Sequence, residues 1–263
     1  MKGNIYIMNA IFDTHTHYDD KAFDEDRDIL LPHIFENGVY AVVNQGTDIG
    51  SSRFGIELAE KYERVFAAVG LHPECLNEKS VNDLEEIKKL AAHPKVAAIG
   101  EIGLDYYYDV PRELQKQIFT SQLNIAKELD MPVNIHDREA HGDMLDILKK
   151  YSPRGILHCF SGSVEMAKDI VRLGMYIGIG GVLTFKNAVK IVEVVRNIPL
   201  ERMVLETDCP YLAPIPFRGK RNDSSYIEYT ARRISEIKGI TVEKVLETTK
   251  YNAECVYNVS VKQ

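Results

Sequence analysis

Residues 11–20 read IFDTHTHYDD, a short apolar start followed by two histidines and three aspartates. His15 and His17 are two positions apart, so on a β-strand both imidazoles project from one face, with Asp13 one step deeper on that face. Taken alone, such a pair is equally consistent with a metal site and with a polar turn that carries solvated histidines. The choice depends on what the other strands of the fold carry.

Seven further runs share the character of the first, being short, rich in β-branched residues and followed by a polar segment with helical periodicity. Eight alternations of strand and helix predict a parallel sheet, and eight is the number that closes a (β/α)8 TIM barrel. Strands are predicted at residues 11–17, 39–46, 65–72, 96–103, 132–137, 155–160, 176–182 and 203–208. Helices are predicted at 26–37, 51–63, 82–92, 111–130, 139–151, 164–173, 188–197, 224–238 and 242–256.

A doubly wound open sheet is the alternative to a barrel, and the positions of polar residues argue against it. These residues fall toward the carboxyl ends of the predicted strands, which in a barrel converge on one mouth, where active sites lie. They are His17, Asn44, Gln45, His72, Glu101, His136, His158 and Asp208. No linker or change of composition interrupts the pattern, so we expect residues 1–263 to form one domain.

Glu101, His136 and His158 lie in the apolar stretches VAAIGEIGL, PVNIH and GILH. Burying an unpaired polar group there would be costly, so a shared ligand is the better explanation. We therefore expect these three residues and Asp208 to join His15 and His17 in a metal site. Imidazole and carboxylate without thiolate suit Zn²⁺, Mn²⁺ or Mg²⁺. Strand alternation predicts that the neighbouring thiols, Cys159 and Cys209, face the opposite way and pack in the core.

Six candidate ligands exceed what one tetrahedral ion needs, and the Glu101 carboxylate could bridge two ions about 3.5–4 Å apart. This predicts a hydrolase in which the ions lower the pKa of a bound water and Asp208 takes its proton. Glu206 either orients a ligand imidazole or is a satisfied core carboxylate. His72, in GLHP, is expected beside the metals in contact with substrate. Structural or surface positions are expected for His33 and His93, and a position on a helix surface is expected for His141.

Composition restricts how the protein attracts a polyanion. Lysine and arginine number 32 against 39 aspartates and glutamates, a net charge of −7, so any attraction must be local. Arg138, two residues after His136, and a basic turn that begins at Arg218 are candidates for phosphate contact. The turn also contains Lys220 and Arg221. One tyrosine of the run 106–108 could stack a base, although packing is expected for at least two of the three.

The compartment is predicted from the cysteines and from the chain start. Four separated cysteines form no CxxC pair, which argues against a disulfide framework and a thiolate zinc site. The opening MKGNIYIMNAIF is too short for a membrane span and a poor secretion signal, and Met8 could be the true start. We expect a soluble, cytoplasmic protein with no membrane association and no obligate protein partner.

With these residues in place, the sequence resembles the TatD family of metal-dependent deoxyribonucleases, within the amidohydrolase-type barrel superfamily, essentially end to end. The resemblance implies that His15, His17, Glu101 and Asp208 hold one divalent ion and that Glu101, His136 and His158 hold the other. It also implies hydrolysis of DNA. The motifs that carry it are DTHTHYDD, GLHPE (70–74), IGEIGLDYY (99–107), PVNIHDREA (132–140), ILHCFSGS (156–163), IGIGG (177–181) and VLETDCPYLAPIPFRGKRN (204–222).

Within the last motif, Arg218 and Asn222 are expected to contact substrate. Similar proteins usually place a Glu-Pro pair after Asn222, whereas this chain has Asp223-Ser224. Ser224 is a good N-cap residue, so the loop is still expected to open a helix there.

Two other functions stay open at this point. One is a hydrolase that uses the same metals to cut a C–N or C–O bond in a small molecule. Many relatives of that kind bridge their ions with a modified lysine on the fourth strand, where this chain has Glu101 and places Lys95 before the strand. The other is a binding module whose metals are structural or absent.

Overall fold

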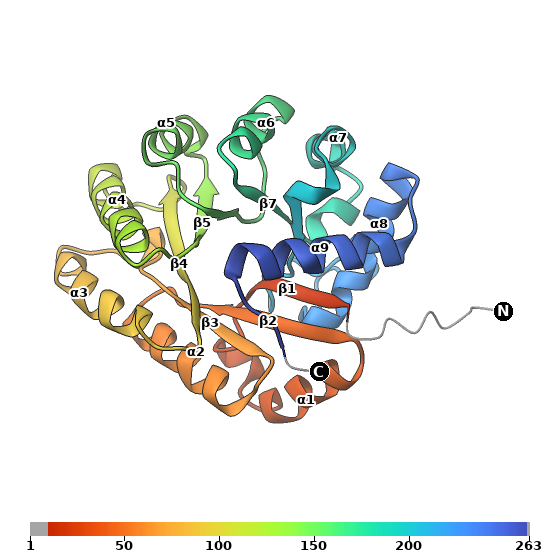
Figure 1. Cartoon of the computed structure of the whole chain (residues 1–263), viewed down its shortest axis with the longest axis horizontal. Coiled ribbons are helices and arrows are strands. Elements are labelled where there is room, and N and C mark those ends of the chain that lie inside the picture. Colours follow the sequence, from red (N-terminus) through yellow and green to blue (C-terminus); the bar gives the residue numbers. More distant parts are fainter. Residues whose placement is uncertain (1–9, 262–263) are drawn as a thin grey trace.

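The computed structural model describes residues 10–261, and in it the predicted parallel barrel is confirmed (Figure 1). Its strands are hydrogen-bonded in the order of the sequence, each parallel to the next. They are β1 (Ile11–Thr16), β2 (Val39–Gln45), β3 (Val65–Val69), β4 (Val96–Asp105), β5 (Val133–Arg138), β6 (Gly155–Leu157), β7 (Tyr176–Ile179) and β8 (Met203–Leu205). The predicted character of the chain start concerns mostly residues 1–9, which lie outside the described residues.

The helices alternate with the strands as predicted, and several begin at residues whose side chains cap them. Asp48 caps α2, Ser163 caps α6 and Thr241 caps α9, each accepting a hydrogen bond from a backbone amide of the first turn. The helices are α1 (Arg27–Glu36), α2 (Ile49–Lys61), α3 (Ser80–Ala91), α4 (Arg112–Glu128), α5 (His141–Tyr151), α6 (Val164–Arg172), α7 (Val189–Asn197), α8 (Ile227–Lys238) and α9 (Val242–Tyr257). Within residues 10–261, none is both long enough and apolar enough to cross a bilayer.

The segment before α8 differs from the prediction. A 3-10 turn, η5 (Ser224–Tyr226), precedes the helix, and its cap is Asp223, whose carboxylate accepts from the Ser225 amide. Ser224 is fully buried and its hydroxyl donates instead to Asp13, 2.7 Å away. The prediction of Ser224 as the N-cap was wrong because a buried carboxylate competes for the same hydroxyl.

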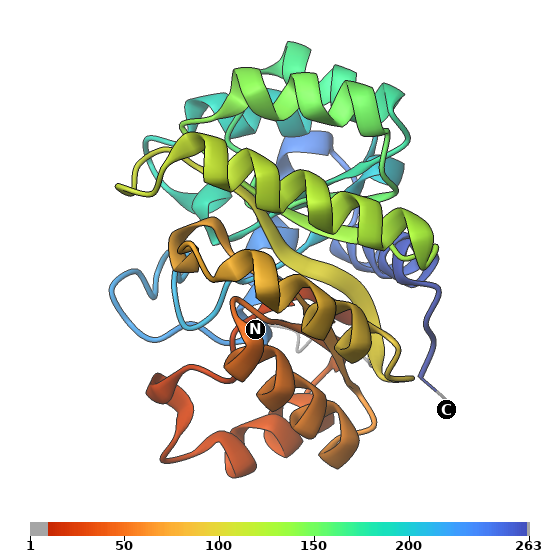
Figure 2. The ribbon, with the colours of Figure 1, turned by 90° about the vertical axis from the view of Figure 1, so that its left-hand side faces the viewer.

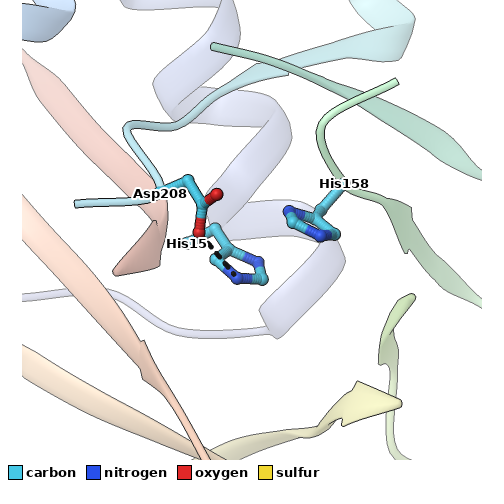
Figure 3. Close-up of side chains that lie close together, drawn as sticks. All are labelled: His15, His158 and Asp208. Carbon is cyan, nitrogen blue, oxygen red and sulfur yellow. Dashed lines mark ion pairs between the residues drawn. The ribbon is translucent and has the colours of Figure 1, made fainter. Parts of the chain in front are cut away.

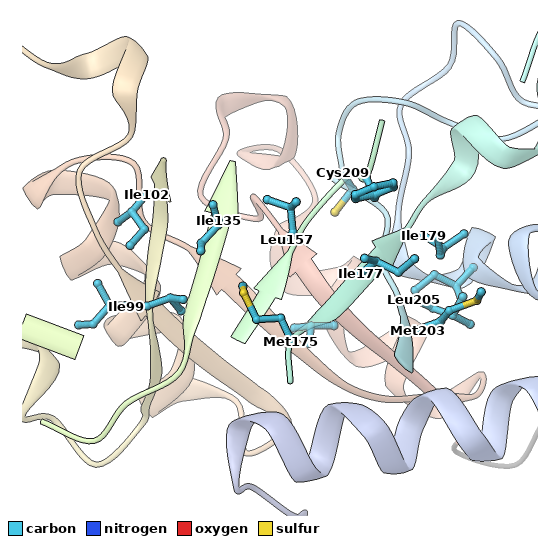
Figure 4. Packing of buried hydrophobic residues seen from close by; sticks show 14 of the residues in the cluster. Ile99, Ile102, Ile135, Leu157, Met175, Ile177, Ile179, Met203, Leu205 and Cys209 are labelled. Carbon is cyan, nitrogen blue, oxygen red and sulfur yellow. The ribbon is translucent and has the colours of Figure 1, made fainter. Parts of the chain in front are cut away.

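Most of the apolar core lies between the strands and the surrounding helices. Figure 4 shows outward-facing side chains of β4 to β8, which pack in this layer. They include Ile99, Ile102, Ile135, Leu157, Ile177 and Leu205. Figure 2, turned by 90°, shows the helices lying over the strands, with the loop after β8 projecting on one side and the C-terminus on the other. The helical layer therefore leaves the carboxyl ends of the strands free to form a site.

The interior of the barrel is packed in two kinds of layer. Toward the amino ends of the strands it is apolar, and α9 adds Val256 and Tyr257 to a cluster that contains Phe12 of β1. Above it, the backbone carbonyl of Thr14 lies 3.1 Å from the amide nitrogen of Gln45, 3.2 Å from that of Asn134 and 2.9 Å from the Tyr257 hydroxyl. Buried polar groups at this depth are thus hydrogen-bonded and form the floor beneath the mouth.

Closure of the barrel between β8 and β1 involves the segments that carry the predicted ligands. The Asp208 amide donates to the His15 carbonyl at 3.0 Å, and the His17 amide donates to the Cys209 carbonyl at 2.9 Å. Asp13 completes the seam because its carboxylate accepts from the amide and the hydroxyl of Thr207, at 3.0 and 2.6 Å. Backbone pairing therefore fixes His15 beside Asp208.

Gly103 provides a test of how closely β4 and β5 approach. Its φ is +150°, and a Cβ at this position would lie 2.0 Å from the backbone oxygen of His136. Gly103→Ala should lower the free energy of unfolding by about 2–6 kcal/mol, the sum of backbone strain and overpacking. Urea denaturation followed by far-UV circular dichroism measures this change.

The matched control is Gly142→Ala in α5, where an added Cβ has open space around it. That substitution should be neutral or stabilising by up to about 1 kcal/mol because alanine favours helix and restricts the unfolded chain. Equal stability of the two variants would contradict the proposed close approach.

Candidate metal centre

The carboxylate of Glu101 lies at the centre of the mouth, and its two oxygens face different histidines. Oε2 is 3.2 Å from His15 Nε2 and 3.5 Å from His17 Nε2. Oε1 is 2.9 Å from His136 Nδ1 and 2.9 Å from His158 Nε2. Four strands or their carboxyl-terminal extensions supply these five side chains, so the barrel brings together residues that are far apart in sequence.

Asp208 approaches the first pair from the end of β8. Its Oδ1 lies 3.4 Å from His17 Nε2 and 3.7 Å from His15 Nε2. Figure 3 shows the aspartate directed at His15, with the ring of His158 alongside; the two imidazoles stack with centroids 3.8 Å apart. All six predicted ligands therefore lie in one cluster.

The spacing of the imidazole nitrogens fits a pair of metal ions. His15 Nε2 and His17 Nε2 are 3.2 Å apart, and so are His136 Nδ1 and His158 Nε2. Two nitrogens that each lie about 2.05 Å from one tetrahedral ion are about 3.3 Å apart. No lysine or arginine forms an ion pair with Glu101 or Asp208 among the described residues. The donor set, the spacing and the unneutralised carboxylates fit divalent cations.

His72 belongs to the same cluster. Its Nε2 lies 3.4 Å from Glu101 Oε1, and ligand atoms of His72, Glu101 and His136 fall within 4.8 Å of one another. The side chain is buried but borders the cavity. It therefore lies where it can contact either an ion or a substrate atom held next to one.

Two further carboxylates lie behind the histidines, and one of them, Asp105, is within hydrogen-bond distance of an imidazole. Asp105 Oδ2 is 2.9 Å from His136 Nε2, so the imidazole is clamped between Asp105 and Glu101. Glu206 Oε1 is 3.9 Å from His158 Nδ1 and accepts a hydrogen bond from the Cys159 amide. The Glu206 side chain packs against Gly178, where any larger residue would clash, since a Cβ on residue 178 would lie 2.2 Å from Glu206 Oε2. Such partners orient ligand imidazoles in metal sites.

Burial and mutual charge set the ionisation of the cluster. Burial opposes ionisation of Glu101, but the surrounding histidines, first His72 and then His158 and His15, hold its pKa well below the usual value. Burial lowers the pKa of His15 to about 4 because it disfavours the charged imidazolium. The imidazole is therefore neutral, as a metal ligand must be. Burial raises the pKa of Glu206 to about 8, so this carboxyl is favoured in its protonated form near neutral pH.

Asp208 behaves differently from Glu206. Burial raises the pKa of Asp208, but the hydrogen bond from His17 and the charges of nearby histidines outweigh it, and the net pKa is lowered. The side chain keeps one fifth of its surface exposed and borders the cavity. Asp208 is therefore an accessible carboxylate near neutral pH.

A cavity of about 700 Å³ opens above the cluster at the carboxyl ends of the strands. Arg138 lies on its wall, as predicted for a residue that contacts substrate. Asp19 also borders the cavity and accepts a hydrogen bond from the Asn44 side chain. Cys159 borders it as well, contrary to the predicted packing role, because β6 ends at Leu157 and Cys159 has a left-handed φ of 43°.

The predicted substrate contacts from the loop after β8 need correction. Asn222 is fully buried, and its side-chain amide donates to the carbonyls of Thr207 and Tyr211, so it shapes the loop instead of facing the cavity. Arg218 is exposed but packs on the ring of Phe185, 4.5 Å away, outside the cavity wall. Arg221 forms a bidentate ion pair with Asp26. The positive charge of the basic turn that begins at Arg218 is therefore partly neutralised.

Comparisons with known proteins agree with this geometry. A family model described as "TatD related DNase" matches residues 12–258. The Bacillus subtilis protein "Uncharacterized metal-dependent hydrolase YabD" is 41% identical over 95% of this chain and its own full length. The Escherichia fergusonii "3'-5' ssDNA/RNA exonuclease TatD" is 34% identical, over 95% of this chain and 100% of the relative.

A solved structure extends the similarity to the fold. The crystal structure of YjjV, a TatD homolog from Escherichia coli K12, aligns with a TM-score of 0.89 and 32% identity, covering 95% of this chain and 99% of that one. The family model matches nearly the whole barrel, and the relatives match it end to end. The chain therefore belongs to the family of TatD-related DNases.

Proposed function

We propose that this protein is a divalent-metal-dependent phosphodiesterase that hydrolyses DNA, removing nucleotides from a strand end. The observation that carries the proposal is the division of the Glu101 carboxylate between two groups of histidines, with His15 and His17 at one oxygen and His136, His158 and His72 at the other. Such a carboxylate suits a bridge between two ions, the arrangement that many nucleases and phosphatases use. The name of the Escherichia fergusonii relative supports the substrate class.

In this proposal the cluster binds two ions, Zn²⁺, Mn²⁺ or Mg²⁺. His15, His17 and Asp208 would hold one ion, His136 and His158 the other, and Glu101 both. When bound, such ions lower the pKa of a coordinated water and stabilise the charge that develops on the attacked phosphate. We expect the protein to act in the cytoplasm, independently of membranes and of an obligate protein partner.

The chain's own residues supply the remaining steps. Asp208 accepts the proton of the attacking water because it is ionised and faces the cavity. Arg138 and His72 line the same wall and hold the phosphate of the substrate. Arg218 would contact a longer strand only beyond the cavity. Asp105 keeps the ring of His136 in place, so that this ligand need not reorganise during the reaction.

A small-molecule hydrolase is the second candidate, and the charge of the cavity wall favours it. Among the described residues that line the cavity, Arg138 is the one lysine or arginine, whereas Asp19, Asp20 and Glu74 add negative charge around the entrance. A neutral amide or ester would meet no repulsion there. Glu101 still stands where amide-cleaving relatives carry a modified lysine, which keeps phosphodiester cleavage as the leading proposal.

The leading proposal is tested by offering both substrate classes to metal-loaded protein. End-labelled single-stranded and duplex DNA should be shortened stepwise from one end with Mg²⁺, Mn²⁺ or Zn²⁺, and chelation with EDTA should stop the reaction. A panel of amides, lactones and acyl esters serves as the comparison. Faster turnover of that panel, with intact DNA in every metal, would replace the first candidate with the second.

Asp208→Asn and Glu101→Gln test the two carboxylates of the cluster. Asp208→Asn should lower kcat by about 10²–10⁴-fold because the general base is lost. Glu101→Gln should lower activity and also the metal content, measured by elemental analysis of protein purified without chelator. Glu247→Gln, an exposed change in α9, is the control and should keep both. Full activity in either site variant would contradict the assigned roles.

Asp105→Asn tests the support behind His136. The amide cannot accept both the imidazole and the backbone hydrogen bonds as strongly as the carboxylate, so metal affinity should fall about 10–100-fold. Competition with a fluorescent chelator measures the change. The melting temperature identifies a variant that has merely lost stability, and unaltered metal affinity would show that Asp105 does not orient the ligand.

A further inference from the structure

Three side chains form an exposed aromatic and cationic ledge, of which Tyr108 and Arg138 line the cavity and Tyr107 lies next to them, outside the lining. The guanidinium carbon of Arg138 lies 3.8 Å from the centroid of the Tyr107 ring and 5.8 Å from that of Tyr108. The two rings are perpendicular, with centroids 5.4 Å apart. Tyr107 is 60% exposed and Tyr108 37%, so the expectation that at least two tyrosines of the run 106–108 pack inside was wrong.

The ledge is joined to the metal cluster through Asp105. In the parallel pairing of β4 with β5, Asp105 aligns with Arg138, so the residues that follow β4 emerge beside the end of β5. One oxygen of Asp105 lies against His136 and the other accepts the Tyr107 amide at 2.9 Å. The same carboxylate therefore orients a ligand and fixes the backbone of the ledge.

Arg138 is available to bind an anion. It is exposed, lines the cavity and forms no ion pair with a carboxylate within residues 10–261. Its stacking on Tyr107 occupies the face of the guanidinium and leaves the N–H groups at the edge free to donate. Asp19, Asp20 and Glu74 come from the β1 and β3 loops, and Asp105 and Asp137 line the cavity on the β4–β5 side, where Arg138 supplies the favourable contact for a polyanion.

We propose that Tyr107, Tyr108 and Arg138 form a binding site for one unpaired nucleotide, with the base stacked on the exposed rings and the phosphate held by the guanidinium. The site rests on the proposed nuclease function and determines its preference: a base in a duplex is already stacked and paired, so a single strand engages the ledge and a duplex does not. Because a ring accepts any base, the preference concerns pairing and not sequence.

The test measures binding of metal-loaded protein to a fluorescein-labelled oligothymidylate by anisotropy. Phosphorothioate linkages slow cleavage during the measurement, and an otherwise identical strand with abasic sites lacks the rings that would stack. Tyr107→Ala should weaken binding of the oligothymidylate about ten-fold. It should have much less effect on the abasic strand, and Tyr107→Phe should restore the preference for bases.

Arg138→Gln should act through charge. The slope of log affinity against log salt concentration should become shallower by about 0.7, the contribution of one phosphate contact on a single strand. Arg138→Lys should retain that slope and lose part of the affinity because an ammonium does not stack on the ring as a planar guanidinium does. The matched control is Arg112→Gln, which removes a guanidinium stacked 4.3 Å from the Tyr106 ring but away from the cavity wall.

The outcomes separate the ledge from the nuclease proposal. Failure of the wild-type protein to cleave methyl p-nitrophenyl phosphate or any oligonucleotide would contradict nuclease function, whereas base-dependent binding would still identify the ledge. Equal weakening of the normal and abasic strands by Tyr107→Ala, or a salt slope unaltered by Arg138→Gln, would overturn the ledge. All these side chains are exposed, so unchanged circular dichroism and melting temperature are expected to accompany the result.

Discussion

The buried carboxylate of Asp13 is the interaction on which the mouth of the barrel depends. It accepts hydrogen bonds from three segments, the His15 amide of β1, the Thr207 amide and hydroxyl after β8, and the Ser224 hydroxyl before α8. Complete burial raises its pKa to about 7 even though four hydrogen bonds act in the opposite direction. The site thus depends on a group that is costly to bury and that only this set of donors satisfies.

Glu101 presents the complementary problem, a buried anion in a cluster of imidazoles with no permanent cation beside it. A buried charge of this kind contributes little to the stability of the fold and could often be replaced by apolar residues without loss. Its surroundings make sense as the requirements of a ligand. The histidines favour ionisation of Glu101, while the burial of His15 favours the neutral imidazole. Both residues are thereby kept in the protonation states that coordination needs.

The sequence predicted the barrel and the six clustered side chains because both follow from simple periodicity. Every strand was found, and the polar residues at their carboxyl ends meet at one mouth. Asp105 was not predicted as a site residue because the predicted strand stopped at Gly103. Extending the strand by two residues would have placed Asp105 on the same face as Glu101. The predicted packing of Cys159 in the core failed because the predicted strand was too long. β6 ends before Cys159, so the alternation of side chains along a strand does not apply to it.

Tertiary contacts, which no local pattern encodes, account for the other differences. Asn222 was expected to contact substrate because it follows a basic turn. Its side-chain amide instead donates to two backbone carbonyls of the same loop. Arg221 was grouped with Arg218 as a free cation, but Asp26, far earlier in the chain, neutralises it. Tyr107 and Tyr108 resembled core residues by composition, and only the pairing of β4 with β5 brings Arg138 over them.

The proposed ligands come from distant parts of the chain, from His15 in the first strand to Asp208 after the last. During synthesis the histidines of β1 leave the ribosome long before the aspartate that completes their cluster, and the seam between β1 and β8 can close only afterwards. A partly made chain therefore exposes imidazoles and carboxylates without the geometry to hold a divalent cation. Hydrolytic competence is acquired late, as a property of the finished molecule alone.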